Sequence, residues 1–192
     1  MGCDSNEREA VKVANIDVFD GLVNAVLRNK IESFIMNSGF RIGWPDAVYG
    51  PKAAYKCMYS GFTKEDLINC GLGNVIFTAP EIAPFIEGKE LLKCLVNLTR
   101  AGDVHFTHSH PAGETVVLYY ANLDWLPEWW GETIFYNDDG SNIVHASRYT
   151  PGRIVVFDGT IPHAIRPQST IGPQYRFTVT SIFTDIPPKA EA

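Results

Sequence analysis

The five histidines of the chain lie between positions 105 and 163, and three of them fall within six residues. His108 and His110 are two residues apart, and side chains at this spacing on an extended strand point to the same face. His163 follows a strand-like run and a turn, so it could supply a third imidazole from a later strand. Neutral imidazole nitrogens suit iron, zinc, copper and nickel. The pattern is compatible with a metal site, and equally with a polar strand end that carries solvated or packed histidines.

The other two histidines are less favourably placed. His105 has the opposite strand parity from His108, so we expect it to point away from a metal. His145 precedes a turn, and we expect a surface or packing role for it.

The elements that must position these residues change in character along the chain. Amphipathic patterns predict a helix over 20–37 and a helical region over 79–98, which a capping box of Thr78 and Glu81 would begin. The run 74–77 between them is predicted to be extended. After position 102 come four short runs rich in β-branched and aromatic residues, at 115–120, 132–136, 153–157 and 177–183. This order predicts a helical support packed against an antiparallel β-sandwich or barrel.

Length and charge exclude several classes. A chain of 192 residues favours one domain over 1–192, and its net charge of −6 disfavours a protein that binds nucleic acid through phosphates. No run of eighteen apolar residues predicts a membrane span, and no secretory signal is recognisable. The four cysteines lack metal-finger spacing, so we expect free thiols and a cytoplasmic protein.

Five segments stand in an order that is typical of one enzyme family. They are 102–108, which ends at a histidine, 115–125 (TVVLYYANLDW), 130–135 (WGETIF), 151–163 (PGRIVVFDGTIPH) and 175–178 (YRFT). Together they resemble the catalytic core of the iron(II)- and 2-oxoglutarate-dependent oxygenases, most closely the prolyl 4-hydroxylase-like branch. The resemblance implies a mainly β fold, a double-stranded β-helix (jelly-roll) with flanking N-terminal α-helices. Residues 101–186 would form this core and 1–100 a helical support and variable region.

The resemblance also implies roles for individual residues. His108 and His163 would bind Fe(II), and Arg176 would hold the distal carboxylate of 2-oxoglutarate. Thr178, on the same strand face, and Tyr120, on a neighbouring segment, could bind the cosubstrate too. The implied reaction is a dioxygenase reaction that consumes dioxygen and 2-oxoglutarate, most simply a hydroxylation.

The substrate is less well specified by the sequence. Arg166, Trp125 and Trp130 would lie near the pocket rim and are candidates to contact it. A peptide side chain and a small molecule are both compatible with the pattern, and the oligomeric state is not indicated.

One departure from the family pattern concerns the third metal ligand. The family motif is H-x-D, whereas this chain has His108-Ser109-His110. We expect His110 to take the place of the carboxylate, because it keeps the two-residue offset. Alternatively, Glu114 reaches in from the following loop, or His110 pairs with Ala112 and leaves a position for chloride, or iron is not bound productively.

The same residues also resemble a second family. His108, His110 and Glu114, followed by His163, fit the two metal motifs of the cupins, which share the double-stranded β-helix and need no 2-oxoglutarate. That interpretation leaves Arg176 unexplained. A metal-free binding domain is the third possibility.

Overall fold

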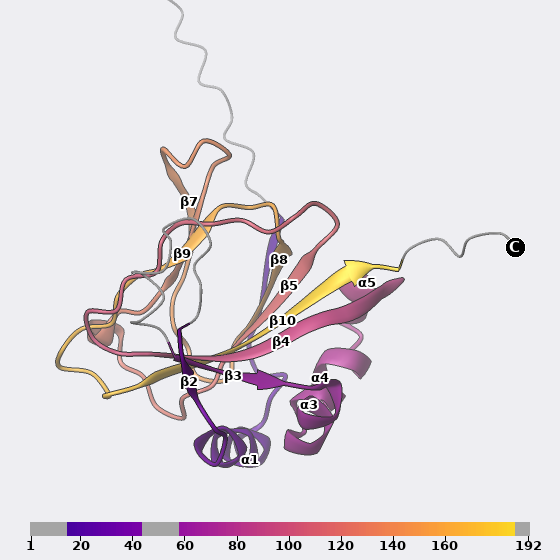
Figure 1. Ribbon diagram of the computed structural model, residues 1–192, viewed down its shortest axis with the longest axis horizontal. Helices are drawn as coiled ribbons and strands as arrows, with labels where there is room; N and C mark the ends of the chain where they lie inside the picture. Colours follow the sequence, from indigo (N-terminus) through magenta and orange to yellow (C-terminus); the bar gives the residue numbers. More distant parts are fainter. Residues whose placement is uncertain (1–14, 44–57, 187–192) are drawn as a thin grey trace, which may run out of the picture.

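Two antiparallel β-sheets face each other in the computed structural model, which describes residues 15–43 and 58–186 (Figure 1). The larger sheet has the strand order β1-β8-β5-β10-β4-β3-β2, and the smaller has the order β7-β6-β9. The strands are β1 Ile16–Phe19, β2 Arg41–Ile42, β3 Met58–Phe62, β4 Lys89–Thr99, β5 Thr115–Tyr120, β6 Thr133–Tyr136, β7 Ile143–Ser147, β8 Ile154–Asp158, β9 His163–Ile165 and β10 Arg176–Asp185. The helices are α1 Ala25–Met36, α3 Lys64–Cys70, α4 Leu72–Thr78, α5 Ala83–Ile86 and the short 3-10 helix η1 Pro127–Trp129.

The central strands are buried on both faces, which explains their nearly continuous apolar sequences. Along β5, Val117 and Tyr119 pack into a core beneath the helices, whereas Val116, Leu118 and Tyr120 pack into a second core between the sheets. This separation follows from the alternation of side chains along a strand. The inner faces of the strands are therefore the surfaces that can line an enclosed site.

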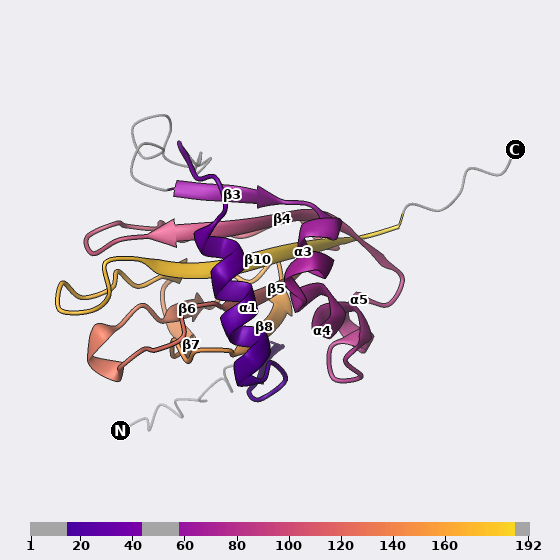
Figure 2. The same ribbon diagram turned by 90° about the horizontal axis from the view of Figure 1, so that it is seen from below.

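Helices α1, α3, α4 and α5 cover the outer face of the larger sheet (Figure 2). Helix α1 begins later than predicted, because Asn24 caps it by accepting a hydrogen bond from the Leu27 amide. Asp20, the first residue of the predicted helix, lies outside α1 and accepts hydrogen bonds from the Arg153 guanidinium at 2.8 Å. Within the described ranges, no helix has the length and apolarity needed to cross a membrane.

The predicted helix over 79–98 is wrong in its larger part. Only α5 is helical there, and Lys89–Thr99 forms β4, which pairs with β10 along its whole length and with β3 from Cys94 onward. The Leu, Lys and Glu residues of this run favour a helix locally, but pairing with two strands overrides that propensity.

The segment before it also differs from the prediction. Residues 74–77 lie inside α4 rather than in an extended run, and the Thr78 hydroxyl donates back to the Asn74 carbonyl oxygen instead of capping a new helix. A capping box does occur, but at Thr63 and Asp66, where it begins α3.

Candidate metal and cosubstrate site

Three imidazoles converge on the inner side of the fold. His108 pairs with His163, the first residue of β9, as an antiparallel bridge in which each backbone amide donates to the other's carbonyl oxygen, at 3.0 and 2.9 Å. His110 follows two residues later, and the ring centroids of the three histidines lie 4.4 to 5.5 Å apart. One potential ligand nitrogen from each ring lies within 4.8 Å of the others. This arrangement could hold a metal ion on one face.

The ring orientations leave one nitrogen of each histidine available. The Nδ1 of His108 lies 3.1 Å from the Phe106 carbonyl oxygen, and the Nδ1 of His163 lies 2.8 Å from that of Ile161. A carbonyl oxygen only accepts, so both Nδ1 atoms carry a proton, and in the neutral tautomer of each ring the Nε2 keeps its lone pair. Such partners orient metal-binding histidines. Burial lowers the pKa of His163 to about 3, so its ring is neutral near pH 7.

Glu114 lies beside His110 and outside the group of three converging nitrogens. Its Oε2 is 3.4 Å from the His110 Nδ1, and both side chains are largely buried. The backbone of Gly159 binds both residues. Its carbonyl oxygen accepts a hydrogen bond from the His110 amide at 2.7 Å, and its amide donates to the Glu114 carbonyl oxygen at 2.8 Å. Burial, followed by the nearby His108 and Lys93, lowers the pKa of His110 to about 4. A carboxylate against Nδ1 is the arrangement that orients and strengthens an imidazole ligand.

Arg176 is a fully buried cation with unused hydrogen-bond donors. Its Nε donates to the Gly131 carbonyl oxygen at 3.0 Å, and its guanidinium lies 4.7 Å from the centre of the Tyr149 ring. Its Nη1 and Nη2 are buried and have no hydrogen-bond partner among the described residues, and the same is true of the Thr178 Oγ1. Burial lowers the pKa of Arg176. Unpartnered buried donors are costly, so this arrangement favours an anion with planar oxygens beside them.

Tyr120 is close to Arg176, but its hydroxyl is already engaged. The oxygen lies 2.8 Å from the Thr133 Oγ1 and 3.2 Å from the carbonyl oxygen of Ser147, and the whole residue is buried. In this arrangement Tyr120 therefore has no free hydroxyl donor for the cosubstrate, which the sequence analysis expected it to bind.

The candidate substrate residues lie in two different environments. Arg166 and Trp130 are both partly exposed and stack on each other, with the guanidinium 4.3 Å from the ring centre, and Arg166 also lies 3.6 Å from Glu132. Trp125 is buried, and its indole N–H donates to the Trp130 carbonyl oxygen at 2.8 Å. Trp125 thus packs against Tyr149 in the inner core, and the exposed aromatic surface comes from Trp130.

A cavity of about 80 Å³ lies against the three converging histidines and Thr178. Its walls come from the inner faces of both sheets, and they include Leu95, Asn97, His105, His108, His110, Val116, Leu118, Thr133, Phe157, His163, Ala164, Ile165, Thr178, Thr180 and Ile182. Asn97 is not among the residues that the sequence predicts for the site, because the pattern of its segment predicts a helix. Its amide donates to the Thr180 Oγ1 at 3.0 Å across β4 and β10.

His105 lies outside the group of three converging nitrogens, but it lines the same cavity as the other three histidines. Strand parity does not apply to it, since residues 101–107 form a turn and irregular backbone rather than a strand. Gly102 has a φ of +84°, and the Asp103 amide donates to the Arg100 carbonyl oxygen at 3.0 Å, so the chain turns immediately before His105. His145 is only partly exposed on β7 and contacts Phe135, as a packing role requires.

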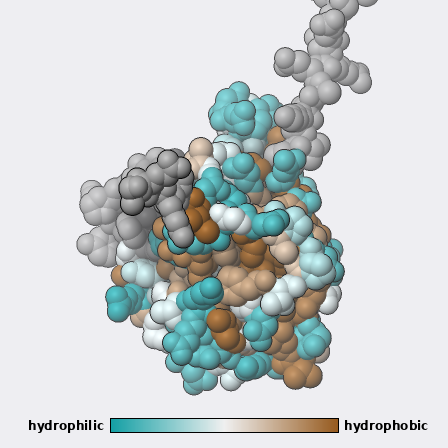
Figure 3. Space-filling view, turned by 90° about the vertical axis from the view of Figure 1, so that its right-hand side faces the viewer, coloured by the Kyte–Doolittle hydropathy of each residue, from teal (hydrophilic) through white to brown (hydrophobic). Residues whose placement is uncertain are grey.

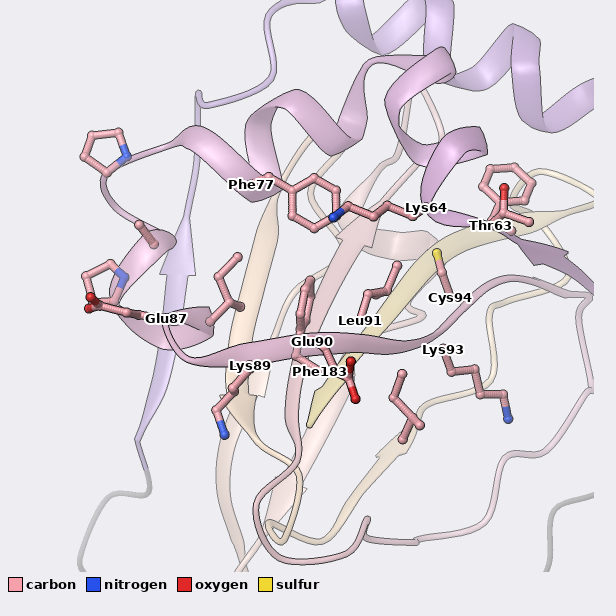
Figure 4. A pocket seen from close by; sticks show the side chains of 16 residues that line it. Thr63, Lys64, Phe77, Glu87, Lys89, Glu90, Leu91, Lys93, Cys94 and Phe183 are labelled. Atoms are coloured by element: carbon pink, nitrogen blue, oxygen red, sulfur yellow. The ribbon is translucent and has the colours of Figure 1, made fainter. Parts of the chain in front are cut away.

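A larger groove lies elsewhere, between β4 and the helices α3, α4 and α5 (Figure 4). It measures about 990 Å³ and is lined by apolar residues, lysines and glutamates. The Lys64 ammonium in its wall lies 5.0 Å from the centre of the Phe77 ring. The end of the molecule that carries α5 and the last residues of β10 shows apolar residues interspersed with hydrophilic ones (Figure 3). This groove contains none of the converging histidines, so the smaller cavity is the candidate site.

Comparison with known proteins bears on the fold. No protein-family model matches the chain, and a search of curated proteins gives no match. Solved structures do match: a prolyl-4-hydroxylase from Pseudomonas putida has a TM-score of 0.63 and 16% identity, covering 90% of this chain and 94% of that one. A prolyl hydroxylase from Trichoplax adhaerens, solved with a peptide of hypoxia inducible factor, has a TM-score of 0.65 and 15% identity, covering 88% of this chain and 83% of that one.

A third match is HygX from Streptomyces hygroscopicus with nickel and 2-oxoglutarate bound, at a TM-score of 0.67 and 8% identity, covering 90% of this chain and 84% of that one. Identities this low establish the fold alone, and they agree with the resemblance found in the sequence. The predicted mainly β architecture is confirmed: the chain has the double-stranded β-helix fold of the 2-oxoglutarate- and Fe(II)-dependent oxygenases, with helices packed on its larger sheet.

Proposed function

We propose that this protein is an Fe(II)- and 2-oxoglutarate-dependent dioxygenase that hydroxylates an unactivated C–H bond of a peptide side chain or small molecule. The observation that carries the proposal is the pairing of two features on one inner surface. Three imidazoles converge there, and a buried Arg176 with two unpartnered nitrogens lies on the same strand as Thr178, which lines the cavity. The first suits a metal and the second suits a carboxylate, as 2-oxoglutarate requires.

The residues divide the work as follows. The Nε2 atoms of His108, His110 and His163 would hold Fe(II), each ring being oriented through its Nδ1. Arg176 and Thr178 would bind the distal carboxylate and so orient the cosubstrate. When bound, Fe(II) and 2-oxoglutarate supply the oxidising chemistry, in which dioxygen is consumed and the cosubstrate becomes succinate and carbon dioxide. The apolar cavity walls would exclude water from this reaction.

Similar structures lend support for the substrate class and the cosubstrate. One is described with a peptide bound, another with 2-oxoglutarate, nickel and the small molecule hygromycin B. The stacked Trp130 and Arg166 provide a partly exposed surface where such a substrate would first make contact. A cytoplasmic location stays a prediction from the sequence.

The test is binding of 2-oxoglutarate to the Fe(II)-loaded protein under anaerobic conditions, measured by calorimetry. Arg176→Ala should weaken it by about 2–5 kcal/mol, the range for removing one partner of a buried charged pair. Arg166→Ala is the matched control, because that guanidinium is partly exposed and should matter little to the cosubstrate. Equal effects of the two variants would contradict the proposal.

A second measurement separates the proposal from the cupin alternative. Fe(II)-dependent formation of succinate from 2-oxoglutarate is expected for the dioxygenase. Turnover of substrate without 2-oxoglutarate would favour a cupin-type metalloenzyme. Incorporation of added chloride into the product would favour the alternative in which His110 pairs with Ala112 and leaves a metal position for chloride.

A further inference from the structure

The side chain of Tyr149 packs against the guanidinium of Arg176. Tyr149 lies between β7 and β8 and is 1% exposed. The centre of its ring is 4.7 Å from the guanidinium, within the distance of about 6 Å at which an aromatic ring attracts a cation. The ring of Tyr120 stacks on that of Tyr149 at 4.6 Å and lies 5.7 Å from the same guanidinium. Two aromatic rings therefore lie close to this buried cation, and Tyr149 is the nearer.

The contact with the ring uses none of the hydrogen-bond donors of Arg176, because the aromatic face attracts the guanidinium through its charge. The Nε donates to the Gly131 carbonyl oxygen, and Nη1 and Nη2 have no hydrogen-bond partner among the described residues. A carboxylate binds a guanidinium best through two parallel hydrogen bonds, which require a fixed orientation of the planar group. Tyr149 and Gly131 together restrict that orientation and leave Nη1 and Nη2 for a ligand.

The hydroxyl of Tyr149 fixes the ring to the backbone beside Arg176. The oxygen lies 2.6 Å from both the Phe177 carbonyl oxygen and the Asn122 Oδ1, and it accepts from the Asn122 amide at 3.0 Å. The Asn122 side chain also accepts from the Phe177 amide at 2.8 Å and donates to the Tyr175 carbonyl oxygen at 3.0 Å. One network therefore binds the residues on both sides of Arg176 and the ring that packs against its guanidinium.

We propose that Tyr149 is a positioning residue for 2-oxoglutarate, whose ring holds the Arg176 guanidinium in the orientation that binds the distal carboxylate. This inference rests on the proposed function, in which Arg176 binds that carboxylate. Tyr149 acts through Arg176, since its own hydroxyl is engaged in the backbone network. Its ring should therefore matter for a 2-oxo acid that has a distal carboxylate and not for one that lacks it.

The experiment compares two 2-oxo acids on the full-length protein loaded with Fe(II) under argon. 2-Oxoglutarate and pyruvate share the carboxylate and oxo group that chelate a metal, but pyruvate lacks the distal carboxylate. Calorimetric titrations give the Kd of each acid for the wild type and for Tyr149→Leu, which removes the ring. We expect the Kd of 2-oxoglutarate to rise about tenfold or more, while the Kd of pyruvate and of Fe(II) stay within about twofold.

Two further variants separate the ring from the rest of the structure. Tyr149→Phe keeps the ring and loses the hydroxyl, so it should lower the urea midpoint of unfolding but raise the Kd of 2-oxoglutarate less than about threefold. Tyr119→Leu is the matched control, because Tyr119 is equally buried on β5 but packs into the core beneath the helices. This variant should destabilise the fold and leave the Kd of both acids unchanged.

A substitution that keeps the shape of the ring covers the case in which Tyr149→Leu does not fold. The face of an aromatic ring carries negative potential, which fluorination of the ring removes. Pentafluorophenylalanine at position 149 should therefore weaken 2-oxoglutarate binding at least about threefold relative to Tyr149→Phe, with the Kd of pyruvate unchanged.

The opposing outcomes are distinct. If Tyr149→Leu binds 2-oxoglutarate as the wild type does while Arg176→Ala binds it weakly, this inference is overturned and the proposed function stands. Equal losses for the two acids would also overturn it, because they would show a general structural effect. Equal losses in Tyr149→Phe and Tyr149→Leu would assign the effect to the hydroxyl and not to the ring. A wild-type protein that binds 2-oxoglutarate no more tightly than pyruvate would refute the proposed function itself.

Discussion

Glu114 provides the most direct test of how this site works without a carboxylate in its ligand motif. Its Oε2 lies 3.4 Å from the His110 Nδ1, with 11% of its side chain exposed. We predict that Glu114 acts through His110, by orienting the ring and placing a negative charge next to it, and that it is not itself a ligand. Glu114→Gln keeps the size of the side chain and removes its charge, whereas Glu114→Ala removes both.

The geometry sets the expected magnitude. Loss of an outer partner of a metal-binding histidine typically costs about 10–100-fold in metal affinity. The 3.4 Å separation is longer than the usual N–H···O range of about 2.7–3.2 Å, so the contact is weaker than a short charge-assisted bond. We therefore expect Glu114→Gln to weaken Fe(II) binding about tenfold, which corresponds to about 1.4 kcal/mol. His110→Ala, which deletes a ligand, should cost more than about 100-fold, beyond the range for an outer partner.

Metal affinity is measured by competition with a fluorescent chelator, and coordination by the visible spectrum of the Co(II)-substituted protein. Glu114→Gln should keep the wild-type spectrum, since the ligand set is unchanged. The exposed Glu81, changed to Gln, serves as the control and should alter neither measurement. If Glu114→Gln loses metal as fully as His110→Ala and changes the Co(II) spectrum, Glu114 completes the triad and our assignment is wrong. Wild-type affinity in Glu114→Gln would remove any role for the carboxylate.

Two further predictions concern the surroundings of the site. Gly131→Ala should lower the free energy of unfolding in urea by about 1–2 kcal/mol, because Gly131 has a φ of +83° and a Cβ there would lie 3.1 Å from the Arg176 Nε; an unchanged urea midpoint would contradict this. The Cys94 thiol is buried, and burial raises its pKa to about 12. Peptide mapping after N-ethylmaleimide treatment at pH 8–9 should therefore find Cys94 unmodified in the native protein and alkylated only in denaturant. Rapid labelling of the native protein would contradict this and show that the core opens.

The fold could be predicted where a strand has a local signal in its composition, and not where only pairing with distant strands defines it. The run 115–120 is rich in β-branched and aromatic residues and is buried on both faces, so composition and structure agree at β5. The run 89–99 has a composition that suits a helix, and only its pairing with β10 and β3, which are distant in sequence, makes it β4. Such long-range pairing has no local signal in one sequence.

The same distinction applies to the candidate site. The two-residue spacing of His108 and His110 could be read directly, and His163 does lie beside them, although their metal-binding role stays a prediction. His105 could not be placed, because a turn at Gly102 breaks the parity on which the expectation rested. Four free cysteines were expected; Cys70 and Cys94 are free, and the other two lie outside the described residues.

The charges of the interior offer a physical reason why a histidine can occupy the carboxylate position here. Under the proposed function, a divalent ion and the Arg176 guanidinium bring three positive charges into a largely buried region. The buried rings of His110 and His163 are neutral near pH 7, so they offset none of this charge. The two carboxylates of 2-oxoglutarate and the carboxylate of Glu114 bring three negative charges, and buried charges are tolerated when they are paired. Glu114, which contacts the candidate ligand His110 rather than the metal itself, would thus supply the negative charge that an aspartate ligand would otherwise bring.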